Sequence, residues 1–112
     1  MKIAALIPAF NEERNIAAVV AGARPFVSLV LVVDDGSADS TSAAAEQAGA
    51  TVIRHASNVG KGAALKTGFQ YLQEQGFDGA VTIDADGQHD PAEIPSFVRA
   101  AEQGYDMVVG NR

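Results

Sequence analysis

The chain has 112 residues, 47% of them hydrophobic and 20% charged, and its formal net charge is −6 at pH 7. These values are typical of a single soluble globular domain and argue against intrinsic disorder. Lys and Arg do not cluster in the sequence. Nucleic acid is therefore not expected as a partner, because neutralising a phosphate backbone needs gathered cations.

Cysteine is absent, which excludes disulfides, zinc–thiolate sites and thiol nucleophiles and permits a reducing compartment. The apolar run at the N-terminus is too short for the core of a signal peptide, and no stretch is long enough to span a membrane. We therefore expect a cytoplasmic location.

Apolar runs of strand length alternate with helical patterns, which predicts an α/β fold: a mostly parallel sheet in three layers, with helices on both faces. Connections are short and no repeat or linker interrupts residues 1–112, so we expect one unit. The five predicted strands are Lys2 to Ile7, Leu29 to Val33, Thr51 to Arg54, Ala80 to Ile83 and Met107 to Val109.

Four helices are predicted between these strands. The first begins near Glu12 with Asn11 as its N-cap, and the second follows Asp39 and ends before Gly49. The fourth begins at Asp90-Pro91-Ala92-Glu93, a capping box with proline at the first helical position. Core-facing positions of the first, third and fourth helices are Ile16, Val19, Val20 and Ala23; Leu65, Phe69 and Leu72; and Ile94, Phe97, Val98 and Ala101.

Polar segments follow the first, second and fourth strands, at residues 8–12, 34–37 and 84–90. The carboxyl ends of parallel strands meet at one edge of the sheet, and ligands bind in the crevice beyond it. Some acids there have an ordinary role, since Asp39, Asp90 and Glu13 suit helix N-termini.

Four further acids, Asp34, Asp35, Asp84 and Asp86, outnumber the capping positions, and their mutual repulsion calls for a compensating cation. Asp84, Asp86 and Gln88 offer hard oxygen ligands at alternate positions. This pattern suits Mg²⁺ or Mn²⁺, with phosphate oxygens completing the coordination.

His89, His55 and Lys61 are interpreted more simply. Each histidine is expected to be solvated or hydrogen-bonded, although His89 could ligate a metal. Lys61 is expected to be a solvated side chain at the start of a helix, with a phosphate contact as the alternative. The sequence lacks P-loop spacing, and no Gly-x-Gly-x-x-Gly follows the first strand, so a dinucleotide cofactor is not expected.

Five segments carry a family resemblance: Ile-Pro-Ala-Phe-Asn-Glu-Glu at 7–13, Val-Val-Asp-Asp-Gly-Ser at 32–37, Asn-Val-Gly-Lys-Gly at 58–62, Asp-Ala-Asp-Gly-Gln-His at 84–89 and Gly-Asn-Arg at 110–112. Together they resemble family 2 glycosyltransferases, most closely the dolichol-phosphate and polyprenyl-phosphate branch. The resemblance implies the Rossmann-like, nucleotide-sugar-binding half of the GT-A fold. One departure is Asn111, where the family has serine.

The resemblance also implies which residues form the site. Substrate-binding residues would be Pro8, Ala9, Phe10, Glu12, Val33, Asp35, Asp84, Ala85, Asp86, Gln88 and Arg112. Asp84 and Asp86 would be catalytic, and the metal ligands would be Asp84, Asp86 and Gln88.

The family's reaction is an inverting displacement at the anomeric carbon of a nucleotide diphosphate sugar, of the GDP-mannose or UDP-glucose type. A divalent cation would stabilise the departing pyrophosphate. No general base beyond the donor carboxylates is evident, which fits an anionic lipid phosphate such as polyprenyl phosphate as acceptor. The absence of a general base fits equally well a chain truncated before its acceptor half, which is the interpretation we favour. The parent enzyme would then lie at the cytoplasmic face of a membrane.

Two other functions are considered. The chain could be a nucleotide- and metal-binding module without turnover, because the acceptor half is missing. A nucleotidyltransferase would need a glycine-rich segment after the first strand, and Pro8-Ala9-Phe10-Asn11 contains no glycine. A sheet cut at its edge leaves strand hydrogen bonds uncovered, so we also expect self-association.

Overall fold

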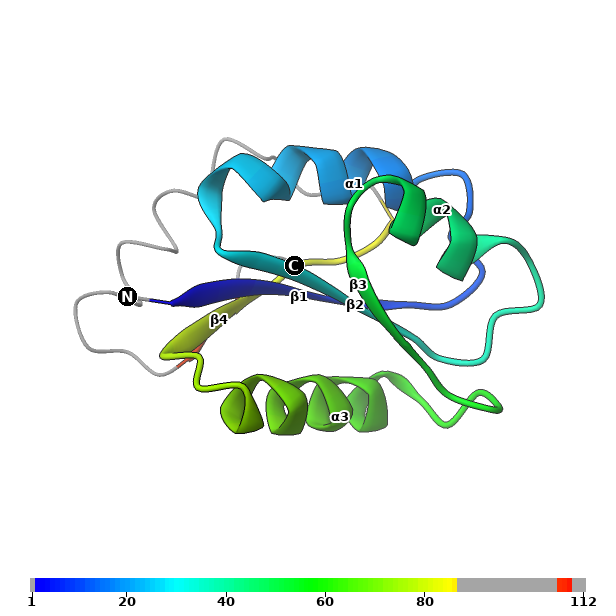
Figure 1. Ribbon diagram of the computed structural model, residues 1–112. Coiled ribbons are helices and arrows are strands. Elements are labelled where there is room, and N and C mark those ends of the chain that lie inside the picture. Colours follow the sequence, from blue (N-terminus) through cyan, green and yellow to red (C-terminus); the bar gives the residue numbers. More distant parts are fainter. Residues whose placement is uncertain (1, 87–106, 110–112) are drawn as a thin grey trace.

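The computed structural model describes residues 2–86 and 107–109 and shows a sheet with helices on both faces (Figure 1). The strands are β1 (Ile3–Ala9), β2 (Leu29–Asp34), β3 (Thr51–Arg54), β4 (Gly79–Thr82) and β5 (Met107–Val109). The helices of the described ranges are α1 (Ile16–Ala23), the 3-10 helix η1 (Arg24–Phe26), α2 (Thr41–Gln47) and α3 (Lys61–Glu74). The predicted three-layer α/β class is confirmed.

The strand order is β3-β2-β1-β4-β5, and each neighbouring pair is parallel. From β1 the chain proceeds outward to β3 and then returns past β1 to β4. Since such crossovers are right-handed, reversing their direction places α1 and α2 on one face and α3 on the other, as Figure 1 shows. The reversal occurs between β1 and β4, which is where open α/β sheets bind ligands.

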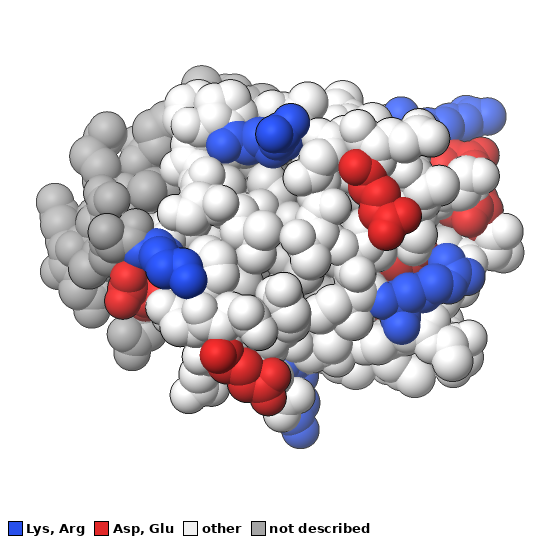
Figure 2. Space-filling model, viewed as in Figure 1, with Lys and Arg blue, Asp and Glu red and all other residues white. Residues whose placement is uncertain are grey.

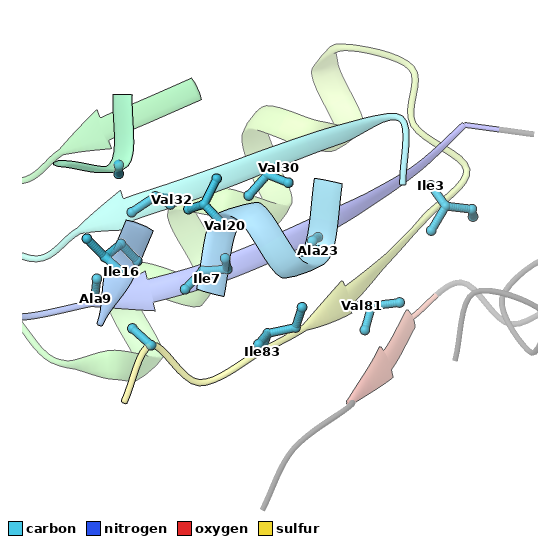
Figure 3. Packing of buried hydrophobic residues seen from close by; sticks show 13 residues of the cluster. Ile3, Ile7, Ala9, Ile16, Val20, Ala23, Val30, Val32, Val81 and Ile83 are labelled. Carbon is cyan, nitrogen blue, oxygen red and sulfur yellow. The ribbon is translucent and has the colours of Figure 1, made fainter. Parts of the chain in front are cut away.

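Successive side chains of a strand point to opposite faces, and β1 therefore contributes to two cores. Its odd-numbered residues pack with the buried face of α1, namely Ile16, Val20 and Ala23 (Figure 3). Its even-numbered residues Ala4 and Leu6 lie in a second cluster beneath α3.

The predicted core-facing stripes of the first and third helices are confirmed. Val19 packs against the first cluster, Leu72 is buried in the second, and Leu65 and Phe69 pack against it. The predicted fourth helix, with Ile94, Phe97, Val98 and Ala101, lies outside the described residues.

The predicted start of the first helix is wrong. α1 begins at Ile16 rather than near Glu12, and Asn11 does not cap it, because Asn11 has a left-handed φ of 53°. Residues 12–15 form a turn that leads into α1, since the Glu12 carbonyl accepts from the Asn15 and Ile16 amides, while the Glu12 and Glu13 amides donate to Thr41, the first residue of α2, and to Asp39. The predicted end of the second helix before Gly49 is confirmed.

Strand boundaries differ from the predicted ones by up to two residues, mainly at the end of β1, which continues through Pro8 to Ala9. β2 supports this extension, since Pro8 pairs with Val33 and Ala9 with Asp34.

β3 is the outer strand of the described sheet on the side of β2. Self-association through a sheet edge stays a prediction.

Charged side chains are spread over the surface. Figure 2 shows Lys and Arg at separate places on the face seen in Figure 1, several of them beside Asp or Glu.

Among the described helices, none has the length and apolarity needed to cross a bilayer.

Candidate functional site

A cavity of about 350 Å³ opens at the carboxyl ends of β1, β2 and β4. It is lined by Pro8, Ala9, Phe10, Glu12, Asp35, Asn58, Lys61, Ala64, Asp84, Ala85 and Asp86. All three polar segments expected at this edge of the sheet therefore contribute to one cavity.

The opening follows from where the strands separate. β1 pairs with β4 only as far as Leu6 and Thr82, and one further bond runs from the Ile83 amide to the Leu6 carbonyl at 3.0 Å. Beyond that point β1 stays with β2, and the amide of Asp35, directly after β2, donates to the Ala9 carbonyl at 2.8 Å. Pro8 suits this divergence, because it has no N–H that would need a partner on the side of β4.

Eight of the eleven predicted substrate-binding residues line the cavity, namely Pro8, Ala9, Phe10, Glu12, Asp35, Asp84, Ala85 and Asp86. Val33 does not, because its side chain is fully buried in the cluster beneath α3. Gln88 and Arg112 lie outside the described residues, as do His89 and Asp90.

Residues 10–13 are held in place by the segment that precedes α2. The Asn11 amide donates to Ser37 Oγ at 2.8 Å, and the Asn11 side-chain oxygen accepts from the Ala38 amide at 2.9 Å. Asp39 and Glu13 have a structural role, but neither is the helix N-terminal residue that we expected, because the N-cap of α2 is Ser40 and α1 has no acidic residue in its first turn. The Asp39 carboxylate accepts from the amides of Thr41 and Glu13, and Glu13 accepts from the Ser40 amide.

Those bonds fix the backbone after Phe10, and the bond from the Asp35 amide to the Ala9 carbonyl fixes it before Phe10. Its side chain is 46% exposed although it lines the cavity. A large exposed aromatic side chain at a cavity mouth offers a surface on which a planar ligand can stack.

Asp34 is a structural carboxylate, and the prediction that its charge needs a bound cation is wrong. Its side chain is fully buried and accepts hydrogen bonds from the Ser37 amide at 2.9 Å, from Ser42 Oγ at 2.5 Å and from Arg54 Nη1 at 3.0 Å. Burial raises the pKa of Asp34, but the bonds from Ser37 and Ser42 and the Arg54 charge outweigh it, so the net pKa is lowered. The compensating charge is Arg54.

Asp35 is also buried, but on the opposite side of the strand, where it borders the cavity. Its Oδ1 bonds to His55 Nδ1 at 2.8 Å and to the Val59 amide at 3.1 Å, and its Oδ2 accepts from the Gly60 amide at 2.8 Å. Burial raises the pKa of Asp35, while the bonds from His55 and from both amides lower it further than burial raises it. A carboxylate is thereby kept ionised beside the cavity.

Asp84 faces Lys61 across the cavity, with Lys61 Nζ at 2.8 Å from Asp84 Oδ1. The Lys61 side chain is 59% exposed, and an ion pair so open to water contributes little to stability. Lys61 can therefore leave Asp84 for another anion. The expectation of a merely solvated Lys61 is corrected, since it lines the cavity and forms this ion pair.

The donor set at this end of β4 fits a divalent cation that shares its coordination with a ligand. Asp84 and Asp86 bring carboxylate oxygens to the cavity, the ligand type that Mg²⁺ and Mn²⁺ prefer. Within residues 2–86 and 107–109, no three His, Asp or Glu side chains are gathered into a complete metal site. Further ligands would come from a bound molecule or from residues outside the described ranges, such as Gln88.

Three cavity-lining residues and His55 were not predicted as site residues. Asn58, Lys61 and Ala64 come from the β3–α3 loop and α3. His55 directly follows β3 at the same edge of the sheet, so the rule that singled out the ends of the other strands could have found it. Its bond to Asp35 depends on tertiary packing and has no signal in the sequence.

Acid titration provides a test of the two buried carboxylates. The pKa values of Asp34 and Asp35 in the folded state lie below the ordinary 3.8, so the unfolded chain takes up protons first as the pH falls. Their stabilisation is complete above that value and is lost toward the lower folded-state pKa values. We expect the free energy of unfolding to fall by about 1.4 kcal/mol per pH unit for each group in that interval.

Urea unfolding measured from about pH 6 down to about pH 2.5 checks this dependence. The variant Asp34→Asn is the control. Its free energy of unfolding should depend less steeply on pH in the acid range, because the contribution of the Asp34 carboxyl group is removed. A midpoint that does not move in this range would contradict the lowered pKa values.

Comparison with known proteins places this chain in a family. The sequence profile of "Glycosyl transferase family 2" matches residues 4–112. The chain belongs to glycosyltransferase family 2. Within the family, it is similar to polyprenol monophosphomannose synthase of Mycolicibacterium smegmatis, with 36% identity over 116 residues, 96% of this chain and 43% of that protein.

Undecaprenyl-phosphate mannosyltransferase of Micrococcus luteus is 35% identical over 119 residues, which cover 100% of this chain and 49% of that protein. The chain thus spans less than half the length of each of these relatives.

A solved structure shows the same fold. Glucosyl-3-phosphoglycerate synthase from Mycobacterium tuberculosis, in complex with Mg²⁺ and uridine diphosphate, matches with a TM-score of 0.73 and 31% identity, over 88% of this chain and 38% of that one. The same enzyme has been crystallised with Mn²⁺, uridine diphosphate and phosphoglyceric acid. The described residues therefore form part of a GT-A fold, and this structural neighbour has been crystallised with divalent metals.

Proposed function

We propose that the chain is the donor-binding part of an inverting glycosyltransferase, which binds a nucleotide diphosphate sugar together with Mg²⁺ or Mn²⁺. The observation that carries the proposal is that residues 8–12, Asp35 and residues 84–86 meet in the same cavity at the reversal point of the sheet. Ligands of open α/β sheets bind at such a point.

The nucleoside would lie against the ends of β1 and β2. There, Phe10 offers an aromatic face, while Glu12 and Asp35 offer acceptors for N–H or O–H groups of the base and ribose. The family relationship supports this assignment, as does the uridine diphosphate bound by the structural neighbour.

The diphosphate would lie at the end of β4, where the metal ligands are proposed to be Asp84, Asp86 and Gln88. A divalent cation there supplies Lewis-acid stabilisation of the charge that develops on the leaving pyrophosphate. Lys61 would exchange Asp84 for a phosphate oxygen, which its exposure and weak pairing allow. These residues would orient the donor through its phosphates.

For the acceptor we propose polyprenyl phosphate, which would place the whole protein at a membrane surface. The support is the similarity to a polyprenol monophosphomannose synthase and an undecaprenyl-phosphate mannosyltransferase. A phosphate acceptor is already anionic and needs no general base. The whole protein's acceptor remains a proposal, because the chain spans less than half of these relatives.

Calorimetric titration tests the donor site. The 112-residue chain is titrated with GDP and with UDP, each with and without Mn²⁺, and then compared with Asp86→Asn. We expect metal-dependent binding of one nucleotide, weakened about tenfold or more in the variant, since loss of one charged ligand costs on the order of 1.5–3 kcal/mol.

The matched control is Asp78→Asn, which makes the same charge change beside the amino end of β4, away from the cavity. It should bind as the unmodified chain does. If folded protein binds neither nucleotide, or if both variants weaken binding equally, the assignment of the site is wrong. Binding without transfer to polyprenyl phosphate would favour the alternative of a module without turnover.

A further inference from the structure

We propose that His55 is a positioning residue for the nucleotide: its imidazole fixes the Asp35 carboxylate beside the cavity, although His55 does not line the cavity itself. The inference rests on the proposed function, because Asp35 is one of the residues proposed to bind the nucleoside.

His55 extends the sheet by one residue beyond β3. Its backbone amide donates to the Asp34 carbonyl at 2.8 Å, so the alternation of side chains continues past Arg54. Arg54 points to the side of Asp34 and Ser37. His55 consequently points to the other side, toward α3, where the loop from β3 leads in Figure 1.

The imidazole bridges two elements through both of its nitrogens. Nδ1 lies 2.8 Å from Asp35 Oδ1, at the end of β2, and Nε2 lies 2.8 Å from Thr67 Oγ1, in α3. The Thr67 hydroxyl can either donate or accept, so the arrangement is satisfied by a neutral or a protonated ring. In both states Nδ1–H donates to Asp35. The side chains of His55 and Asp35 are 16% and 5% exposed, so water competes little for the bond between them.

The hydrogen bonds of Asp35 indicate what the ring achieves. A carboxylate has about four acceptor positions. Among the described residues, His55 and the Val59 amide take two on Oδ1, and the Gly60 amide takes one on Oδ2. One position on Oδ2 is left for a ligand in the cavity that Asp35 lines. Without His55 the carboxylate keeps only the two amide bonds, and because the terminal torsion of aspartate is broad, it is held less firmly in that orientation.

Two substitutions distinguish the roles of the two ring nitrogens of His55. The amide nitrogen of asparagine lies close to the position of histidine Nδ1, so His55→Asn keeps the donor to Asp35 and loses Thr67. The amide nitrogen of glutamine reaches the position of Nε2, so His55→Gln keeps Thr67 and loses Asp35. Both variants and the unmodified chain are titrated with UDP and GDP in the presence of Mn²⁺, and their thermal midpoints are measured.

We expect His55→Asn to bind the preferred nucleotide within about threefold of the unmodified chain, and His55→Gln to bind about tenfold more weakly or worse, since a bond to a charged group is lost. Equal affinities in both variants overturn the inference, because a purely structural role would follow the thermal midpoints and not the nitrogen that is kept. If the unmodified chain binds neither nucleotide, the proposed function fails, and the inference fails with it.

A second measurement covers the case in which His55→Gln does not fold. Nuclear magnetic resonance of the unmodified chain observes the ring signals of His55, assigned by their absence in His55→Asn. Saturating nucleotide with Mg²⁺ is expected to shift them, because the ligand and the ring share one carboxylate. Ring signals that stay unchanged at saturation overturn the inference.

Discussion

Replacing Gly36 with alanine is expected to lower the free energy of unfolding by roughly 2–5 kcal/mol. Two costs add up at this position. Gly36 has a left-handed φ of 78°, and a Cβ atom there would lie 2.4 Å from the Ser57 carbonyl carbon and 2.6 Å from the Asn58 amide nitrogen. Both of these are backbone atoms, so no side-chain rotation relieves the clash. Urea unfolding of the variant measures the loss.

Gly76→Ala is the matched control. Gly76 has a φ of 80°, but an added Cβ would meet nothing within 4 Å. This variant should therefore cost only the left-handed strain, about 1–2 kcal/mol. If Gly36→Ala costs no more than Gly76→Ala, the loop at residues 57–58 does not pack against Gly36 as described.

The close approach also matters for the site. The loop that touches Gly36 continues to Val59 and Gly60, whose amides hold the Asp35 carboxylate. A side chain at position 36 would push these amides away from Asp35. We therefore expect any Gly36→Ala protein that still folds to bind nucleotide more weakly.

Replacing Asp34 with alanine is expected to cost about 2–4 kcal/mol of the free energy of unfolding. The substitution leaves the Ser37 amide and Ser42 without their acceptor and removes the partner of Arg54. The cost stays below that of a fully buried ion pair, because the Arg54 side chain is 48% exposed. Denaturant unfolding at neutral pH measures it.

A double-mutant cycle with Asp34→Asn and Arg54→Met tests whether the two charges compensate each other. We expect the double variant to lose less stability than the sum of the single variants, with a coupling of roughly 0.5–3 kcal/mol. A different outcome for the Asp34→Ala variant would contradict the structural role of Asp34: a protein as stable as the unmodified chain that has lost Mn²⁺-dependent nucleotide binding. It would return Asp34 to the cation site.

Much of the site could be predicted because it depends on strand ends. Residues 8–12, Asp35 and residues 84–86 each follow an apolar run, and parallel strands bring such positions to one edge whatever the details of packing. Asp34 and Asp35 could not be told apart in this way. They are neighbours in the sequence, but alternation along the strand turns one toward Arg54 and the other toward the cavity.

The same limit explains the error at the first helix. Glu12 and Glu13 suit a first helical turn by local preference, and Asn11 is a common N-cap. In the structure their amides donate to Thr41 and Asp39, more than twenty residues away, and residues 12–15 form a turn before α1. Local propensity is a weak determinant, and tertiary contacts override it.

The sequence by itself determined the α/β class, the strands and the edge of the sheet that carries the site, because the periodicity of apolar residues is a local property that the chain retains in any context. Only the tertiary structure decided that Arg54 neutralises Asp34, that Lys61 pairs with Asp84, and that His55 holds Asp35. Each of these pairs joins residues at least twenty positions apart. The parallel pairing of β2 with β3 brings Arg54 beside Asp34 and His55 beside Asp35, and the position of α3 over the sheet brings Lys61, its first residue, to Asp84.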